Sequence, residues 1–228
     1  MNCIVCKKSI SENENVITTK CAFNGETLHR YRCPSCGAIC GNKRMLELSS
    51  FDLEKEYKDH YLARGPEVNN TSLEISLLKA LSPKPGETYI NWGAGAGWNE
   101  TKAWATSNSY NLINYDILNK ESIKPCSGII SNNFIEHIQD PIDEFSLMNS
   151  VLSEGDFMIH ATPCWSYCVE RTRFHVLFLE GTSLNVLCEK TGFIQVENIP
   201  LPRYPYSKYP NQASNIKLFR KTKEILDK

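Results

Sequence analysis

Short apolar runs alternate with amphipathic segments along the second half of the chain. Runs bounded by turn residues predict five buried strands, at 88–92, 112–116, 128–132, 157–161 and 193–199. Segments with helical spacing predict helices at 99–107, 141–152 and 182–191. Pro141 suits a first helical turn and Gly192 suits a helix end. Strands that alternate with helices predict an α/β fold with a doubly wound, mostly parallel sheet.

The first part of the chain has a different character. Residues 1–43 are rich in cysteine and turn residues and show little apolar periodicity. Residues 44–62 mix charged and apolar positions in a helix-like pattern, and a second helix is predicted from Thr71 or Ser72 to Leu81, before two prolines and a glycine. We therefore divide the chain into a cysteine-rich module (1–43), a helical linker (44–71) and an α/β domain (72–228).

Two C-x2-C pairs lie in the cysteine-rich module, and 26 residues separate them. The pairs are Cys3 with Cys6 and Cys33 with Cys36. Four thiolates in this spacing suit a tetrahedral Zn²⁺ ion, and a hairpin can occupy the intervening residues. The segment resembles a zinc ribbon, with a structural metal because protein ligands fill all four positions. Cys21 or Cys40 could replace one ligand, and four unmetallated thiols or a redox pair are the alternatives.

Composition narrows the class of protein. The 228 residues are 41% apolar with a net charge of −1, which excludes disorder and disfavours a nucleic-acid binder. The charge is uneven: residues 1–43 and 217–228 each carry +3, and the middle carries −7. With no signal-peptide pattern and no apolar run long enough to span a bilayer, we expect a cytoplasmic protein without membrane contact. Reduced thiols are expected there, so the ten cysteines suggest metal ligation or burial before disulfides.

A glycine-rich turn follows the first predicted strand. Gly93, Gly95 and Gly97 form a G-x-G-x-G pattern between the strand and a helix start. Such a turn lets a ligand approach the backbone, and the helix start adds N–H donors. The third glycine comes one residue too early for the dinucleotide fingerprint, and Trp98 follows it. A nicotinamide dinucleotide is therefore disfavoured.

This turn resembles motif I (D/E-x-G-x-G-x-G) of the class I S-adenosylmethionine-dependent methyltransferases. The resemblance extends over residues 72–199: Asp116 stands where the family places a ribose-binding acid, and the stretches 129–141 and 175–193 match later family segments. It implies a Rossmann-like fold with S-adenosylmethionine as cofactor. The residues that it implies at the cofactor are Asn91, Gly93, Gly95, Gly97, Trp98, Asp116 and Asn132.

The sequence departs from the family pattern in two places. Asn91 replaces the first acid of motif I, which weakens or replaces a contact with the cofactor. Residues 117–127 are too few for the usual helix and third strand. An inactive relative without cofactor is therefore one alternative.

Methyl transfer to a hydroxyl also needs a base, and histidine suits neutral pH. His137 and His175, near the carboxyl edge of the predicted sheet, are the candidates for catalysis, with structural roles as the alternative. We expect His160 to be a core histidine and His29 and His60 to lie at the surface. Arg171 and Arg173 could hold an anionic substrate or be solvated. Trp92, and the thiols of Cys164 and Cys168, are expected in the interior.

The expected function is methylation of a small molecule, with a hydroxyl of a sugar or sugar nucleotide as the leading acceptor. The acidic central part of the chain disfavours nucleic acid as a partner. Two alternatives remain open: a nucleic-acid or protein methyltransferase that docks through the ribbon, and an inactive binding module. The sequence does not fix the oligomeric state.

Overall fold

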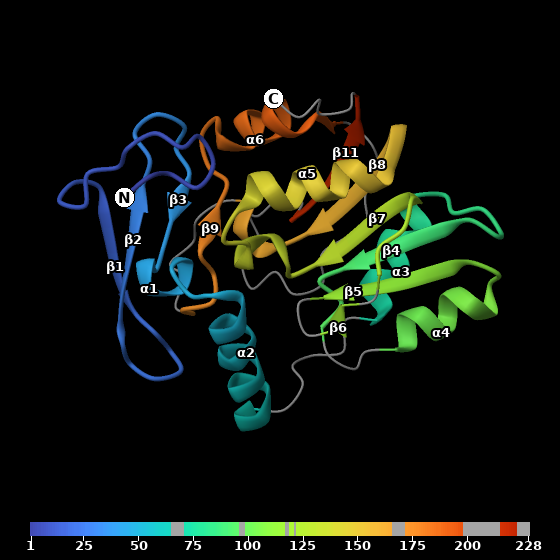
Figure 1. Ribbon diagram of the computed structural model, residues 1–228, viewed down its shortest axis with the longest axis horizontal. Coiled ribbons are helices and arrows are strands. Elements are labelled where there is room, and N and C mark those ends of the chain that lie inside the picture. The colour runs from blue at the N-terminus through green and yellow to red at the C-terminus, as the bar shows by residue number, and fades with distance from the viewer. Residues whose placement is uncertain are drawn as a thin grey trace.

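The computed structural model describes residues 1–64, 71–95, 99–116, 119–120, 122–165, 172–197 and 215–222. These residues form a seven-stranded sheet and a four-stranded sheet that lie side by side (Figure 1). The larger sheet has the order β10-β11-β8-β7-β4-β5-β6, and the smaller has the order β1-β2-β3-β9.

The larger sheet has a parallel centre and antiparallel edges. Its parallel strands are β4 (Thr88–Trp92), β5 (Asn111–Asp116), β7 (Cys126–Asn132) and β8 (Leu152–Ala161). The antiparallel strands are β6 (Asn119–Lys120), β10 (Phe193–Val196) and β11 (Ile216–Lys221). The predicted α/β fold with a mostly parallel sheet is confirmed. The short β6 replaces a full third strand, as the few residues after Asp116 led us to expect.

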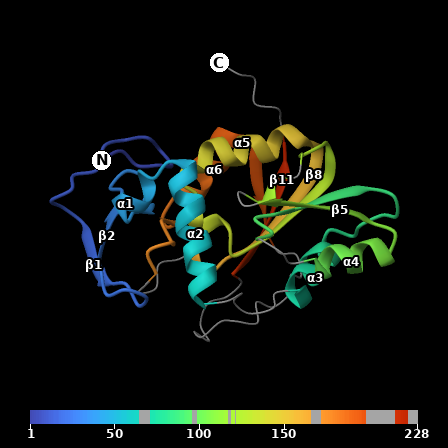
Figure 2. The same ribbon diagram turned by 60° about the horizontal axis from the view of Figure 1, so that its bottom comes forward.

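Helices cover both faces of this sheet (Figure 2). On one face lie α3 (Thr71–Ala80) and α4 (Glu100–Ser107), and on the other lie α5 (Pro141–Val151) and α6 (Ser183–Thr191). Each face of the sheet has its own hydrophobic core, and successive residues of a strand pack into opposite cores. Ile129 packs on the side of α5, and Ile130 packs on the side of α3. Pro141 in the first turn and Gly192 at φ +73° fix the ends of α5 and α6.

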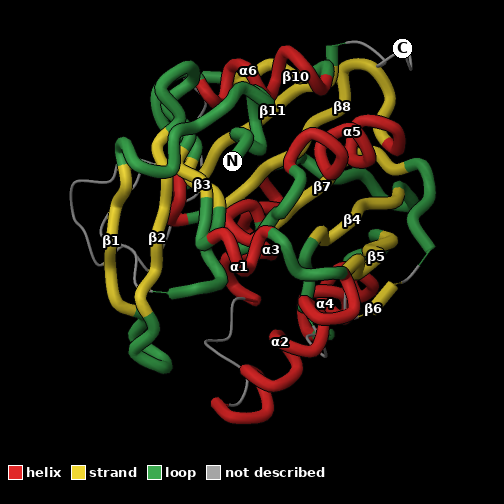
Figure 3. The backbone as a smooth tube through the Cα atoms, turned by 60° about the vertical axis from the view of Figure 1, so that its left-hand side comes forward, coloured by secondary structure: helices red, strands yellow, loops and turns green. Residues whose placement is uncertain are grey.

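The smaller sheet is antiparallel and draws strands from distant parts of the chain. Its strands are β1 (Val16–Lys20), β2 (Thr27–Arg32), β3 (Ile39–Cys40) and β9 (Leu177–Phe178). In the sequence, β1 and β2 lie between the two cysteine pairs and β3 follows the second pair, whereas β9 comes after β8. Figure 3 shows the three strands and their loops together at one side of the molecule. Helices α1 (Lys43–Leu46) and α2 (Ser50–Arg64) connect this sheet to α3.

Several boundaries differ from the predicted ones. β8 begins at Leu152, where the sequence predicted a helix to continue, because Leu152 pairs with Cys126 of β7. β9 and β11 were not predicted, and their few residues carry no distinctive alternation. The predicted loop at 199–210 lies outside the described residues. In the described part of the chain, no helix is both long and apolar enough to cross a membrane.

Candidate functional site

The glycine turn between β4 and α4 is tied to the end of β5. The backbone N–H groups of Gly93 and Ala94 donate to the carbonyl of Tyr115, at 2.7 and 3.2 Å. The N–H of Gly95 donates to Oδ2 of Asp116 at 2.9 Å. Gly93 and Gly95 have φ of +76° and +71°, which favour glycine. The turn and Asp116 thus form one unit at the carboxyl edge of the sheet. Gly97 and Trp98 lie outside the described residues.

Gly93 is required for a reason that sequence reasoning did not supply. A Cβ atom there would lie 2.2 Å from Cδ2 of Phe134 and 2.7 Å from its Cβ. Phe134, just after β7, therefore packs directly on the backbone of the turn. The group that approaches the backbone of Gly93 closely is therefore the Phe134 side chain of the protein itself.

Asn132 ends β7 at the same edge of the sheet. The residue is 6% exposed, and both its amide nitrogen and its amide oxygen are buried without a hydrogen-bond partner among the described residues. Buried amide groups are almost always hydrogen-bonded. Asn132 is therefore suited to a polar ligand that would lie over the strand ends.

Asn91, in β4, is buried and hydrogen-bonded to a carboxyl group of another element. It is 1% exposed, and its Nδ2 donates to Oε2 of Glu74 in α3 at 3.0 Å. The hydroxyl of Thr101, in α4, donates to the same oxygen at 2.5 Å. Burial raises the pKa of Glu74. A carboxylate thus lies beneath the turn although motif I lacks its acid. Sequence reasoning missed Glu74, because it lies on another element and no motif marks it.

Two predictions about buried residues near the turn are confirmed. Trp92 has no exposed surface, and its Nε1 donates to Oε1 of Glu144 at 2.6 Å. His160 is fully buried, with Nδ1 2.5 Å from Oγ of Ser131. Loss of solvation lowers the pKa of His160 to about 3, so it is neutral near pH 7. It is a core histidine.

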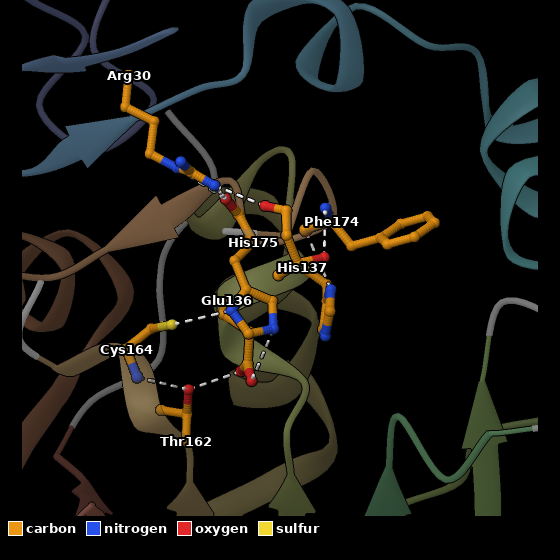
Figure 4. Close-up of polar contacts among 8 residues, drawn as sticks. Arg30, Glu136, His137, Thr162, Cys164, Phe174 and His175 are labelled. Atoms are coloured by element: carbon orange, nitrogen blue, oxygen red, sulfur yellow. Dashed lines mark hydrogen bonds and ion pairs between the residues drawn. The ribbon is translucent and has the colours of Figure 1, made fainter. Parts of the chain in front are cut away.

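The two candidate catalytic histidines lie together. His137 belongs to the 3-10 helix η1 (Ile135–His137) after β7, and its ring centroid is 4.9 Å from that of His175 in an edge-to-face arrangement (Figure 4). Nδ1 of His137 lies 3.0 Å from the carbonyl oxygen of Phe174. Since a carbonyl only accepts, Nδ1 carries the proton and Nε2 carries the lone pair. In the neutral ring, Nε2 is therefore the nitrogen that can accept a proton.

A carboxylate and a thiol flank His175. Oε1 of Glu136 lies 3.9 Å from Nε2 of His175, and Sγ of Cys164 lies 3.5 Å from Nδ1. Cys164 belongs to the 3-10 helix η2 (Pro163–Trp165). Thr162 donates its hydroxyl to Oε2 of Glu136 at 2.7 Å. Glu136 is fully buried and Cys164 is 3% exposed, so the prediction that Cys164 is buried is confirmed. Cys168 lies outside the described residues. Sequence reasoning missed Glu136 as a member of this group.

The smaller sheet holds the segment that carries His175. Nη2 of the fully buried Arg30, in β2, donates to the carbonyl oxygens of Thr172 and His175, at 2.6 and 3.3 Å (Figure 4). The N–H of Gly41 donates to the carbonyl of Val176 at 3.0 Å. With the β3–β9 pairing, these bonds attach the N-terminal module to the site.

Other candidate residues have internal partners. Arg173 pairs with Glu56 of α2 at 2.9 Å, and Arg171 lies outside the described residues. His29 is exposed, as predicted. The prediction that His60 lies at the surface was wrong in part. Its half-buried ring packs against Phe174 and against Phe23, with centroid distances of 4.8 and 4.9 Å, because α2 lies against that aromatic cluster.

The four cysteines of the two C-x2-C pairs converge. Their sulfur atoms lie within 4.8 Å of one another, with Cys3 and Cys36 3.7 Å apart and Cys6 and Cys33 3.5 Å apart. Four sulfurs around a tetrahedral zinc ion are about 3.8 Å apart, given a Zn–S bond near ~2.3 Å. The quartet therefore has the size of a metal centre. The thiol of Cys40 hydrogen-bonds to Cys3 and lowers its pKa, so Cys40 lies next to the quartet. No two of the nine cysteines in the described part of the chain form a disulfide.

Comparisons with known proteins identify the fold. No protein-family model matches the sequence, and no curated protein matches it. The structure is similar to 1,6-didemethyltoxoflavin-N1-methyltransferase of Burkholderia thailandensis, solved with 1,6-didemethyltoxoflavin and S-adenosylhomocysteine bound. The TM-score is 0.50 at 13% identity, over 90% of this chain and 99% of that one.

Two further similarities are weaker. A complex of the Haloferax volcanii Trm112 methyltransferase activator with a putative methyltransferase has a TM-score of 0.46 at 12% identity, over 72% of this chain and 97% of that one. A methyltransferase of calicheamicin biosynthesis has a TM-score of 0.47 at 8% identity, over 75% and 58%. We base no conclusion on these two. The first similarity shows that the chain has the same mixed α/β fold as that methyltransferase.

Proposed function

We propose that this chain is an S-adenosylmethionine-dependent methyltransferase that acts on a small molecule. The observation that carries the proposal is the unit formed by the glycine turn and Asp116, beside the two unpartnered, buried amide atoms of Asn132. Strand ends of a parallel sheet are where such folds bind ligands. The polar groups there fit a cofactor with a ribose diol and charged ends.

Each proposed cofactor residue would have its own role. Asp116, which also holds the N–H of Gly95, would accept hydrogen bonds from the ribose hydroxyls. Gly93, Gly95, Gly97 and Trp98 would line the turn, and Asn132 would bind a polar group over the strand ends. Asn91 would act through Glu74, which it holds beneath the turn. When bound, the cofactor supplies an activated methyl group on its sulfonium.

The acceptor would lie over η1, next to His137 and His175. Nε2 of His137 would take the proton of an acceptor hydroxyl, because the Phe174 carbonyl fixes the Nδ1–H tautomer. His175 packs on the His137 ring and would position it. The remaining contribution of the protein is to hold the acceptor oxygen in line with the methyl group, which can contribute several kcal/mol.

A sugar or sugar-nucleotide hydroxyl is the proposed acceptor. The similar Burkholderia enzyme was solved with the small molecule 1,6-didemethyltoxoflavin, which favours a small acceptor in general. The basic residues of the module also favour it over a macromolecule. Of the six basic residues, Arg30 is buried, and Lys7, Arg32 and Lys43 pair with Asp140, Glu180 and Glu12, which reduces the positive charge that the module offers to a macromolecule. A cytoplasmic location suits such a substrate.

We further propose that Cys3, Cys6, Cys33 and Cys36 hold a structural Zn²⁺ ion. Protein ligands would fill all four positions, which leaves none for a reacting group. On this view residues 1–43 are the zinc ribbon, 44–71 the linker and 72–228 the methyltransferase domain. The ribbon sheet nevertheless includes β9, so the ribbon is part of the domain's structure.

Calorimetry with S-adenosylmethionine tests the proposal. The native chain should bind the cofactor with a 1:1 stoichiometry. Asp116→Ala and Asn132→Leu should each weaken binding by about 10-fold or more, since each loses a buried polar contact. Glu154→Gln, at an exposed position in β8, is the matched control and should bind normally. A native chain that gives no heat and no thermal shift at millimolar cofactor would refute the proposal.

A second experiment tests the acceptor. Sugar nucleotides and free sugars should become methylated, and His137→Gln should lower turnover by about 100-fold while cofactor affinity stays unchanged. Methylation of RNA or protein, with binding that weakens steeply with salt, would instead favour the macromolecular alternative.

A further inference from the structure

Three side chains with metal-binding atoms converge next to the proposed acceptor position. Glu136 comes from η1, Cys164 from η2 and His175 from the segment before β9. One ligand atom from each lies within 4.8 Å of the other two (Figure 4). In the sequence, η1 follows β7, η2 follows β8, and His175 lies just before β9. The fold therefore brings the three side chains together over the carboxyl ends of β7 and β8.

We propose that Glu136, Cys164 and His175 form a second metal site that binds Zn²⁺. A thiolate, an imidazole and a carboxylate together suit zinc, whereas Mg²⁺ and Ca²⁺ prefer oxygen ligands. This site is distinct from the four-cysteine centre, whose ligands are all sulfur. The proposal concerns metal binding and stands whether or not the chain transfers methyl groups.

The distances fit a shared ion. With bonds of about 2.3 Å to sulfur and about 2.0 Å to nitrogen, two ligands on a tetrahedral zinc ion are about 3.6 Å apart. Sγ of Cys164 and Nδ1 of His175 are 3.5 Å apart. A histidine gives one nitrogen to a metal, whereas Cys164 lies at Nδ1 and Glu136 at Nε2 of His175. On a tetrahedral zinc ion the carboxylate oxygen would lie about 3.3 Å from the shared nitrogen, so closure from the 4.8 Å limit needs a shift of up to about 1.5 Å. Rotation of the His175 and Glu136 side chains can supply it.

The surroundings already orient two of the ligands. Thr162 donates to Oε2 of Glu136 at 2.7 Å and accepts from the backbone N–H of Cys164 at 3.1 Å. One hydroxyl thus connects a carboxylate ligand with the backbone of the thiol ligand, as outer hydrogen bonds do in metal sites. Arg30 holds the backbone of His175. The His175 side chain is 17% exposed, which gives an ion a route to the otherwise buried group.

Three protein ligands leave one tetrahedral position open, as in catalytic zinc sites. The ring of His137 lies 4.9 Å from that of His175 between centroids, next to the three ligands. If the proposed function holds, the open position would take the oxygen of the acceptor. A metal-bound hydroxyl loses its proton more readily. His175 would then be a metal ligand, which fits its position next to the ring of His137.

Metal analysis of the full chain tests the site. Protein purified from zinc-supplemented cells should hold two zinc ions per chain. Glu136→Gln, Cys164→Ser and His175→Gln should each lower the content to one. Cys126→Ser, which removes a buried thiol in β7, is the control and should keep two ions. A native chain that holds one ion, and keeps that ion in all three variants, would overturn the proposal.

Cobalt gives a readout that does not depend on activity. Titration of the metal-depleted and refolded chain with Co²⁺ should show two phases, a strong thiolate band from the four-cysteine centre and a weaker band from the single thiolate of Cys164. The second phase should disappear in Cys164→Ser. A single phase in the native chain would refute the site. Failure to bind S-adenosylmethionine would refute the proposed function and leave this result unaffected.

Discussion

The guanidinium of Arg30 donates two hydrogen bonds to the main-chain carbonyl of His175, from Nε and Nη2, both at 3.3 Å. Arg30 belongs to β2 and has no exposed surface. A buried cation that binds carbonyl oxygens orders the segment to which they belong. The cysteine-rich module thus helps to fix where His175 lies.

We predict that Arg30→Met frees the segment around His175. The carbonyls of Thr172 and His175 would lose their partner, which should lower the free energy of unfolding by about 2 kcal/mol. Amide exchange across residues 172–178 should accelerate, and turnover should fall while cofactor affinity stays the same. Hydrogen exchange with mass spectrometry measures the first effect.

Arg32→Met is the matched control for this variant. Arg32 pairs with Glu180, but its side chain is 42% exposed, so the pair should contribute less than about 1 kcal/mol. Equal effects of the two substitutions would contradict a specific role for Arg30.

Gly93→Ala should be much more harmful than its size suggests. The new Cβ would lie 2.2 Å from the Phe134 ring, and φ of +76° adds strain of about 1 kcal/mol. We expect a loss of more than about 3 kcal/mol in urea unfolding. Gly86→Ala has a similar φ of +81° with nothing within 4 Å, and should lose only the strain.

Phe134→Ala should rescue Gly93→Ala in part. It removes the ring atoms that clash but keeps the Cβ at 2.7 Å. If the double variant is no more stable than Gly93→Ala alone, packing of Phe134 is not the reason for glycine at this position.

Asn91→Asp restores the usual acid of motif I, and we expect it to destabilise the protein. The introduced carboxylate would face Glu74, whose oxygen now accepts from the Asn91 amide at 3.0 Å. Two buried carboxylates repel, so the free energy of unfolding should fall by about 2 kcal/mol at pH 7 and recover as the pH falls. Adding Glu74→Gln should restore stability at pH 7, since the new amide can donate to the introduced carboxylate. Tighter cofactor binding by Asn91→Asp with full stability would contradict this role of Glu74.

His160 makes stability depend on pH. Its pKa of about 3 lies below the unfolded value of about 6.5, so the unfolded chain binds the proton first. Stability from this group is complete above pH 6.5 and is lost as the pH falls from 6.5 toward 3. Relative to His160→Asn, which can keep the contact with Ser131, the native chain should lose about 2 kcal/mol between pH 7.5 and pH 5.

Chemical denaturation at several pH values checks this window. His29→Asn, at an exposed position, should change nothing over the same range. A native chain and a His160→Asn variant with parallel pH profiles would show that His160 titrates normally.

Local patterns predicted the four parallel strands of the larger sheet, β10, and the helices that cover its faces. The alternation of short apolar runs with helices, and the spacing from Gly97 to Asp116, depend on neighbours in the chain, so they are visible in the sequence. The convergence of the four cysteines followed from ligand spacing. The contacts of Arg30 with His175, and of Asn91 with Glu74, join elements that are far apart in the sequence. No periodic pattern in the sequence indicates such contacts. β9 is two residues long, too short for a pattern, and is defined only by its partner β3.

Because β3 pairs with β9, the smaller sheet can be completed only after residues 177–178 have been synthesised. During synthesis the cysteine-rich module emerges first, yet the outer edge of its β3 acquires its partner only when Leu177 and Phe178 emerge. Until then Ile39 and Cys40, both fully buried in the finished protein, lack that cover. Early metal binding would hold this module in place while the remaining strands form, so metal supply during translation should affect the yield of folded protein.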